Sequence, residues 1–325
     1  MSTNSGFRLN APPVLSRSAV MRDEPIRTDR VRQLAGWPKA RLVVLDEGGR
    51  TPVDWGDVRG PRDRWDTIAG SGARLVTRPT SGDEPPDDAV LLGEHEGVAY
   101  WAVRGQADLV PGEDPTDWAD LRTVGAALDA LGAGLLTGAV ALLNWHTAAR
   151  FCTRDGSPMH PRNAGWHRVC EANGHEEYPR TDPAVICLVH DGADQVLLAR
   201  QPVWPEGRFS VLAGFVEAGE SLEACVLREI HEEVGAVVRD VEYLGSQAWP
   251  FPRSLMIGFH AVADPTVPLH PADGEIAEAM WVTRDELRAA LADGDWTGGD
   301  GAKRLLLPGR VSIARSMLES WAALE

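Results

Sequence analysis

The sequence has few cysteines and little positive charge. Four cysteines spread over 325 residues do not make a disulfide framework, and this pattern fits a reducing compartment. Lys and Arg together number 32 against 48 Asp and Glu, which gives a formal net charge of −16. This balance argues against a general nucleic-acid surface, because phosphate contacts need clustered basic side chains. A nucleotide must therefore be held by a metal ion and by local contacts.

Long apolar runs are also scarce. Arg and Asp side chains interrupt the first 30 residues, and no apolar core of a secretory signal is visible, so a cytoplasmic location is expected. Residues 125–143 are rich in Ala and Leu and contain a GxxxG pattern, but Asp129 lies within them. We interpret this stretch as buried helix that Gly132 and Gly134 break into two packed helices, and we expect no contact with a membrane.

A motif of glycines and charged residues marks the second half of the chain. Residues 214–235 follow the spacing G-x5-E-x7-R-E-x-x-E-E-x-G, with the fixed positions at Gly214, Glu220, Arg228, Glu229, Glu232, Glu233 and Gly235. Apolar residues recur within the motif at three- and four-residue steps. Residues 222–234 are therefore predicted to form an amphipathic helix that Ser221 caps and Gly235 ends.

The carboxylates of this motif are predicted to converge on one spot. Glu229, Glu232 and Glu233 share a face of the predicted helix, and Glu220 approaches from the preceding loop. For one glutamate a solvated helix face is the commoner interpretation, but the full set rarely falls at these spacings by chance. Such crowding favours bound Mg²⁺ or Mn²⁺, because these ions take oxygen ligands and bridge carboxylates to phosphates. We expect Arg228 to orient the carboxylates without occupying the metal position.

Composition shifts divide the chain into four parts. Residues 1–36 are polar, with several arginines and prolines, and are expected to be a poorly ordered lead-in. Residues 37–150 place short apolar runs between acidic loops and then become helical, which predicts a β-rich domain ending in helices. Residues 151–180 form a loop-rich connector. Residues 181–325 contain several strand patterns around the motif helix, so the fold class is α/β (α+β) with one helix laid against a mixed sheet.

The motif at 214–235 resembles the signature of the Nudix hydrolases. Shortly after it, residues 246–254 read SQAWPFPRS, which is similar to the SQPWPFPxS segment of the NADH pyrophosphatase branch, with Ala248 in place of a proline. The resemblance covers roughly residues 85–325. It implies a C-terminal Nudix α/β/α sandwich that hydrolyses the pyrophosphate bond of NAD(H) to AMP and nicotinamide mononucleotide. Removal of 5′ NAD caps from RNA is a second reaction of the same chemistry, and a homodimer is also implied.

Two alternatives to this function stay open. Other nucleoside diphosphate derivatives, such as ADP-ribose or coenzyme A, suit the same hydrolytic chemistry. A nucleotide sensor that has lost catalysis is an alternative from a different class. The complete set of glutamates weighs against a sensor, because loss of catalysis usually shows first in the metal ligands.

The resemblance also implies which carboxylates are catalytic. Glu229, Glu232 and Glu233 would hold the metal ions, with help from Glu220. Glu275, which matches a family glutamate outside the motif, would be a further ligand or the base. The sequence does not assign the proton acceptor among these groups.

The residues expected to bind substrate are aromatic or lie near the SQAWPFPRS segment. The resemblance implies that the nicotinamide ring stacks on Phe215 and on Tyr178, with Tyr178 coming from the second subunit of a dimer. The further contacts are Gln247, Trp249, Phe251, Ser254, Met256 and Ala314. Independently, Trp249 and Phe251 with their neighbouring prolines predict a stiff aromatic wall suited to planar rings, and the alternative is a proline-rich turn packed on the core.

The connector resembles a zinc ribbon that has lost two of its four thiolates. Cys152 is followed by Asp155 and Cys170 by Asn173, where relatives have two Cys-x-x-Cys pairs, so an all-thiolate site cannot form. Asp155 is able to bind zinc, but Asn is a poor zinc ligand. The nearby histidines, of which one lies in a ligand-like His-x-x-Cys spacing, are His160, His167 and His175. Zinc is therefore expected to be absent.

Overall fold

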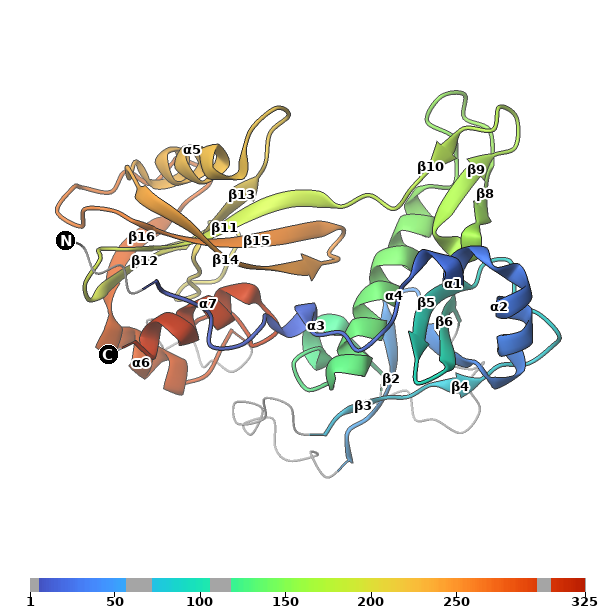
Figure 1. Ribbon diagram of the computed structural model, residues 1–325. Coiled ribbons are helices and arrows are strands. Elements are labelled where there is room, and N and C mark those ends of the chain that lie inside the picture. The colour runs from blue at the N-terminus through green and yellow to red at the C-terminus, as the bar shows by residue number, and fades with distance from the viewer. Residues whose placement is uncertain (1–5, 57–71, 106–117, 297–304, 325) are drawn as a thin grey trace.

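The computed structural model describes residues 6–56, 72–105, 118–296 and 305–324. Two lobes lie side by side in Figure 1, with a short β-hairpin segment projecting from the N-terminal lobe. Both ends of the described chain lie at the C-terminal lobe, so the N-terminal segment has to run along one lobe before it enters the other.

The N-terminal lobe is built from two small sheets and a long helix. The first sheet has the order β4 (Arg78–Pro79), β1 (Arg41–Leu45), β6 (Val98–Arg104) and β5 (Val90–His95). The second has the order β3 (Arg74–Leu75), β2 (Arg50–Asp54) and β7 (Trp118–Asp120). Helix α4 (Ala130–Ala148) packs on these strands, and its buried leucines join the strand valines in one core.

Helix α4 corrects one prediction. The expected break at Gly132 and Gly134 does not occur, because both glycines lie inside one helix that Asp129 caps by accepting a hydrogen bond from the Gly132 amide. The separate helix α3 (Leu121–Val124) ends before it. Gly134 instead allows a close approach, since a Cβ there would lie 2.7 Å from Ser18 Oγ. No helix among the described residues is long and apolar enough to cross a membrane.

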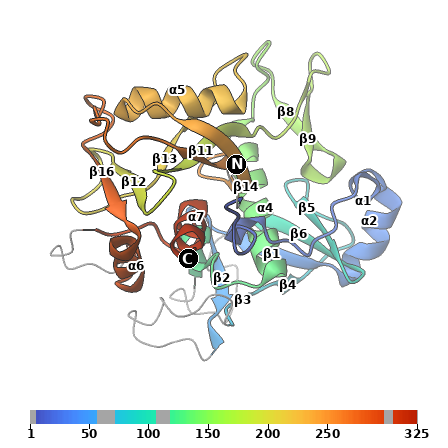
Figure 2. The ribbon, with the colours of Figure 1, turned by 60° about the vertical axis from the view of Figure 1, so that its left-hand side comes forward.

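Residues 6–22 form an extended segment, here called the strap, which runs from the C-terminal lobe to the N-terminal lobe (Figures 1 and 2). The Phe7 ring packs edge-on against His260, with 5.3 Å between centroids, and Leu15 is buried in the core of the other lobe. Helices α1 (Glu24–Thr28) and α2 (Arg30–Gly36) follow. The expectation of a poorly ordered lead-in is therefore wrong from residue 6 on, because distant parts of the chain supply the packing partners; residues 1–5 lie outside the described residues.

The C-terminal lobe is a mixed sheet between helices, as predicted. Strands follow the order β14 (Arg239–Trp249), β15 (Ser254–Val262), β11 (Asp182–His190), β12 (Gln195–Arg200) and β16 (Glu278–Thr283), with β13 (Leu212–Phe215) paired to β11. Strands β11 and β15 are parallel and the other pairs are antiparallel. Helix α5 (Leu222–Val234) covers one face, and α6 (Arg284–Ala292) and α7 (Ile313–Ala322) lie on the other (Figure 1).

Candidate active site

Helix α5 forms as its local sequence predicts. The Ser221 hydroxyl accepts a hydrogen bond from the Ala224 amide at 3.2 Å, and Gly235 ends the helix in the left-handed conformation with φ 71°. Cys225, Val226, Ile230 and other apolar side chains are buried against the sheet, which leaves the charged residues on the remaining faces. The helix therefore presents its carboxylates at the end of β13.

Arg228 organises three of the carboxylates. It binds Glu220 through two hydrogen bonds, from Nε to Oε1 and from Nη2 to Oε2, both at 2.8 Å. Its Nη1 lies 2.9 Å from Glu229 Oε1 and 3.0 Å from Glu232 Oε2. The bound guanidinium is the first cause that lowers the pKa of Glu220, to about 2. This arrangement agrees with the expected orienting role of Arg228.

Glu229 fits only because residue 214 has no side chain. A Cβ built at Gly214 would lie 1.9 Å from the carboxyl carbon of Glu229. The strand that carries Gly214 therefore lies directly against the carboxylate of the helix. This contact explains the first fixed glycine of the motif, because any larger residue displaces Glu229.

Among the described residues, no arginine, lysine or histidine side chain forms an ion pair with Glu233. Its side chain is only 7% exposed, and its buried Oε2 has no hydrogen-bond partner among the described residues. Burial, followed by the charges of Glu229 and Glu275, raises the pKa of Glu233 to about 8. A buried unpaired carboxylate oxygen is unfavourable unless a cation compensates it. The oxygen donor set around Glu233 therefore fits Mg²⁺ or Mn²⁺.

Glu275 reaches this group from the loop between β15 and β16. Backbone hydrogen bonds hold the loop to the end of α5, from His270 N to Val234 O and from Ala272 N to Glu233 O, both at 2.8 Å. Glu275 is exposed, and its charge contributes to the raised pKa of Glu233. A carboxylate outside the motif thus lies within electrostatic range of the motif.

A cavity of about 630 Å³ opens beside Glu233. This volume is in the range of small-molecule sites. Trp249 and Met256 of the predicted substrate residues line it. Phe251 packs edge-on against Trp249, with centroids 5.0 Å apart, and Ser254 is paired with Trp249 across β14 and β15. The structure therefore brings part of the predicted aromatic wall to the carboxylate site.

Six of the eight predicted substrate residues do not line this cavity, and besides Phe251 and Ser254 these are Phe215, Tyr178, Ala314 and Gln247. Phe215 and Tyr178 are exposed, at 60% and 57%, on the outer surface. Ala314 is buried in the core under α7. Gln247 is only 1% exposed, and both ends of its amide are occupied: Oε1 accepts from the Leu15 amide at 3.1 Å, and Nε2 donates to Val311 O at 2.9 Å. Gln247 thus ties the strap to the residues beside the cavity.

Sequence reasoning missed Arg122, which reaches the cavity from α3 of the other lobe. Its guanidinium carbon lies 4.0 Å from the ring centroid of Phe251 and 5.3 Å from that of Trp249. Among the described residues no carboxylate pairs with it. No motif could have indicated this residue, because its neighbours in the cavity lie more than 60 residues away in the sequence.

We expect Arg122→Ala to raise the KM for a substrate that binds in this cavity about tenfold, because the substitution removes a cation that stacks on the aromatic wall. Arg122→Lys should give an intermediate value, since it keeps the charge and loses the planar stacking. Steady-state kinetics measure the effect, with the exposed Arg239→Ala as the matched control. An unchanged KM in Arg122→Ala would show that the arginine only supports the wall.

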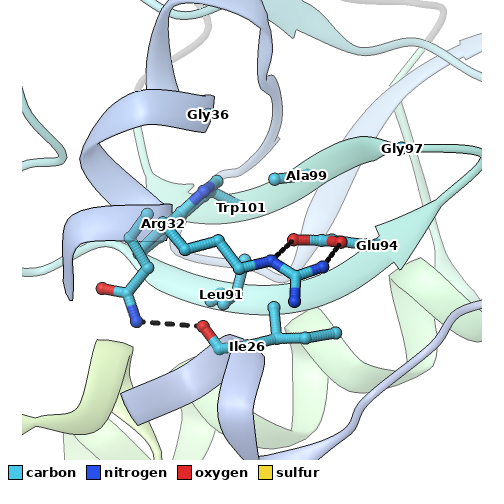
Figure 3. A pocket seen from close by; sticks show the side chains of 9 residues that line it. Ile26, Arg32, Gly36, Leu91, Glu94, Gly97, Ala99 and Trp101 are labelled. Atoms are coloured by element: carbon cyan, nitrogen blue, oxygen red, sulfur yellow. Dashed lines mark hydrogen bonds and ion pairs between the residues drawn. The ribbon is translucent and has the colours of Figure 1, made fainter. Parts of the chain in front are cut away.

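A smaller hollow lies between α2 and strands β5 and β6 (Figure 3). Its volume is about 230 Å³, and its walls include Leu91 and Trp101. Arg32 and Glu94 point toward each other across it and form an ion pair, with Nε to Oε1 at 3.0 Å. Because its two charges neutralise each other, this hollow lacks the uncompensated carboxylate that distinguishes the cavity beside Glu233.

The connector forms a hairpin of β8 (Met159–Arg162) and β9 (His167–Cys170), to which β10 (Glu176–Glu177) adds. Its turns bring Cys152, Asp155 and Cys170 together, with their ligand atoms within 4.8 Å of one another. Asn173 Nδ2 lies 2.5 Å from Asp155 Oδ2 and 3.7 Å from Cys152 Sγ. Two buried thiols and a carboxylate are an accepted donor set for zinc.

Three family models together match most of the chain between residues 57 and 300. A NUDIX domain matches residues 180–300, an NADH pyrophosphatase zinc ribbon domain matches residues 148–178, and an NADH pyrophosphatase-like rudimentary NUDIX domain matches residues 57–145. Together with the mixed sheet and the carboxylates of α5, these matches define the class as a Nudix hydrolase.

Two relatives are similar to the chain over most of its length. The NAD-capped RNA hydrolase NudC of Mycobacterium tuberculosis (strain H37Rv) is 53% identical over 321 residues, which cover 98% of this chain and 97% of that protein. The human mitochondrial NAD(P)H pyrophosphatase NUDT13 is 41% identical over 72% of this chain and 71% of that protein. The chain belongs to the Nudix hydrolase family, in its NADH pyrophosphatase branch.

The expectation that zinc is absent was wrong. The zinc ribbon model matches residues 148–178, and the structure places Asp155 with Cys152 and Cys170 in a group that is able to bind a metal ion. The sequence spacing suggested only that thiolates had been lost. In the folded hairpin, the carboxylate of Asp155 stands where relatives have a cysteine. The three nearby histidines are not in this group: His160 and His175 pair with Glu171 and Glu177, and the His167 ring packs against Tyr178.

We expect the purified protein to hold about one zinc ion per chain, and Cys170→Ser to lose most of it, because a thiolate ligand is replaced by a weak one. Elemental analysis of the protein measures the zinc content, and the melting temperature should fall in parallel. Cys187→Ala, at a buried cysteine outside the group, is the control for cysteine loss alone. Equal zinc in all three proteins would contradict the assignment.

Proposed function

We propose that this protein hydrolyses the pyrophosphate bond of NAD(H) to AMP and nicotinamide mononucleotide, and that it removes 5′ NAD caps from RNA by the same reaction. The observation that carries this proposal is the buried Glu233 carboxylate, whose Oε2 has no hydrogen-bond partner among the described residues, beside a cavity with an aromatic wall. Relatives named as an NAD-capped RNA hydrolase and an NAD(P)H pyrophosphatase support the choice of substrate.

Glu229, Glu232 and Glu233 would hold Mg²⁺ or Mn²⁺, with Glu220 and Glu275 close by. When bound, such an ion polarises phosphoryl oxygens and lowers the pKa of a water molecule. Arg228 holds Glu220 and steadies Glu229 and Glu232. Glu233 and Glu275 are the carboxylates without an arginine partner among the described residues, so one of them would take the proton from water.

We also propose a cytoplasmic homodimer in which Phe215 and Tyr178, both exposed in one chain, stack the nicotinamide ring. Gln247, Ser254 and Ala314 would help to position the residues that line the cavity. Buried clusters that lie largely within each part support a division into residues 37–150, 151–180 and 181–325, and Leu15 and Val311 join the first of them from outside. Light scattering of the purified protein tests the dimer directly.

Product analysis tests the function. The purified protein is incubated with NADH and Mg²⁺ or Mn²⁺, beside Glu233→Gln as the control. AMP and reduced nicotinamide mononucleotide from the unaltered protein alone would support the proposal. Cleavage of ADP-ribose or coenzyme A with none of NADH would overturn it.

A further inference from the structure

The cavity beside Glu233 has a second aromatic surface that the SQAWPFPRS segment does not supply. Trp204, from the loop after β12, and Trp296, from the segment after α6, both line the cavity. Their ring centroids are 4.8 Å apart, and their planes are inclined by 55°. Both side chains are half-buried, and neither belongs to a buried core cluster. Their remaining exposed area therefore faces space that a ligand is able to fill.

The backbone and side-chain contacts of this tryptophan pair fix its position. The Trp296 indole Nε1 donates to Leu306 O at 2.9 Å, and Arg208 Nη2 donates to Trp296 O at 2.9 Å. Arg200 Nη1 donates to Trp204 O at 3.3 Å. The Trp296 ring is held through its indole nitrogen, and the backbone of both tryptophans is held by arginines. Such side chains lose little conformational entropy when a ligand stacks on them.

We propose that the tryptophan pair binds the purine ring of the substrate; this inference rests on the proposed function. A dinucleotide has two planar ring systems at opposite ends of its diphosphate. Besides Trp249 of the SQAWPFPRS segment, which packs against Phe251 and Arg122, the described structure offers two aromatic surfaces near Glu233: the exposed Phe215 on β13 and the tryptophan pair inside the cavity. The bicyclic purine matches the area of an indole, and the smaller nicotinamide ring suits a single phenyl face.

Polar groups at the same end of the cavity fit this assignment. Gln201 and Ser210 line the cavity with Trp204 and provide hydrogen-bonding groups for the edge of a base. The cavity also contains Glu233, so a ring on the tryptophan pair and a diphosphate at the carboxylates lie in one continuous space. The substrate would thus span from α5 to the pair.

Equilibrium binding of the two products tests the proposal. Isothermal titration calorimetry measures the Kd of AMP and of nicotinamide mononucleotide for the full chain in Mg²⁺. We expect Trp296→Leu to weaken AMP binding about five- to a hundredfold, the range for loss of one base–aromatic stack. The Kd of nicotinamide mononucleotide should stay within about twofold, and Trp296→Phe should retain most of the AMP affinity. Val203→Ala is the control, because Val203 is exposed and does not line the cavity.

The outcomes separate this inference from the proposed function. An unchanged Kd of AMP in both Trp296→Leu and Trp204→Leu, with native circular dichroism, would overturn it. So would a selective loss of nicotinamide mononucleotide binding. If the unaltered protein cleaves NADH but the tryptophan variants bind AMP normally, only the inference fails. If the pair binds AMP and NADH is not cleaved, the proposed function fails.

Discussion

Glu233→Gln should lower kcat by about a hundredfold or more and should also make the metal-free protein more stable at pH 8. The loss of turnover follows because an amide neither balances the charge of a divalent cation nor accepts a proton from water. Glu233 is the carboxylate of the motif with a buried unpaired oxygen, so the described structure offers no neighbour to replace it.

The gain in stability has a definite pH dependence. Burial raises the pKa of Glu233 from 4.5 to about 8, so the folded protein holds this proton more tightly than the unfolded chain does. The metal-free protein is therefore expected to lose stability as pH rises from about 5 to about 8, where Glu233 is ionised in half of the folded molecules. The penalty at pH 8 is on the order of a few kcal/mol.

Thermal unfolding in EDTA at pH 5 and pH 8 measures this effect. Glu233→Gln should unfold at a higher temperature than the unaltered protein at pH 8, with little difference at pH 5. Mg²⁺ should narrow the difference by stabilising only the protein that retains the carboxylate. Glu223→Gln is the matched control, since Glu223 is exposed on the same helix. A Glu233→Gln variant that is less stable at both pH values would exclude a buried unpaired charge.

Gly214→Ala should reduce kcat/KM about a hundredfold or more while leaving most of the fold in place. The added methyl group would lie 1.9 Å from the Glu229 carboxyl carbon, so the carboxylate or the strand has to move. A displacement of about 1 Å in a catalytic constellation is enough to lose two orders of magnitude in rate. Steady-state kinetics measure the loss of kcat/KM. The Mg²⁺ concentration for half-maximal activity shows how much of that loss comes from weaker metal binding.

A glycine with free space provides the control for this substitution. A Cβ at Gly36 meets nothing within 4 Å, so Gly36→Ala should leave kcat/KM unchanged. Glu229→Asp in the Gly214→Ala background shortens the displaced side chain by one methylene. Any recovery of Mg²⁺ affinity in that double variant would indicate that the contact between the two residues causes the loss.

The sequence predicted helix α5 well, because residues next to it in the sequence determine where it begins and ends. Ser221 and Gly235 give the limits of α5 as they were predicted. The strap was not predicted, because the packing of Phe7 on His260 and the hydrogen bond from the Leu15 amide to Gln247 join residues more than 200 positions apart. Arg122 was missed for the same reason. The zinc expectation failed because spacing alone does not show that a hairpin turn carries Asp155 to both cysteines.

The strap also determines the order in which the molecule can be completed. The Asn10 amide donates to Ser320 Oγ across 310 positions of sequence, and Phe7 packs against His260. Residues 7–10 of the strap therefore have these two partners only after the C-terminal lobe has been made, whereas Met21, at the other end of the strap, pairs with Glu94 of β5. Closing so long a loop is slow compared with forming local helices. The N-terminal lobe and the end of the strap that packs on it are therefore able to fold early, and residues 7–10 dock last and join the two lobes.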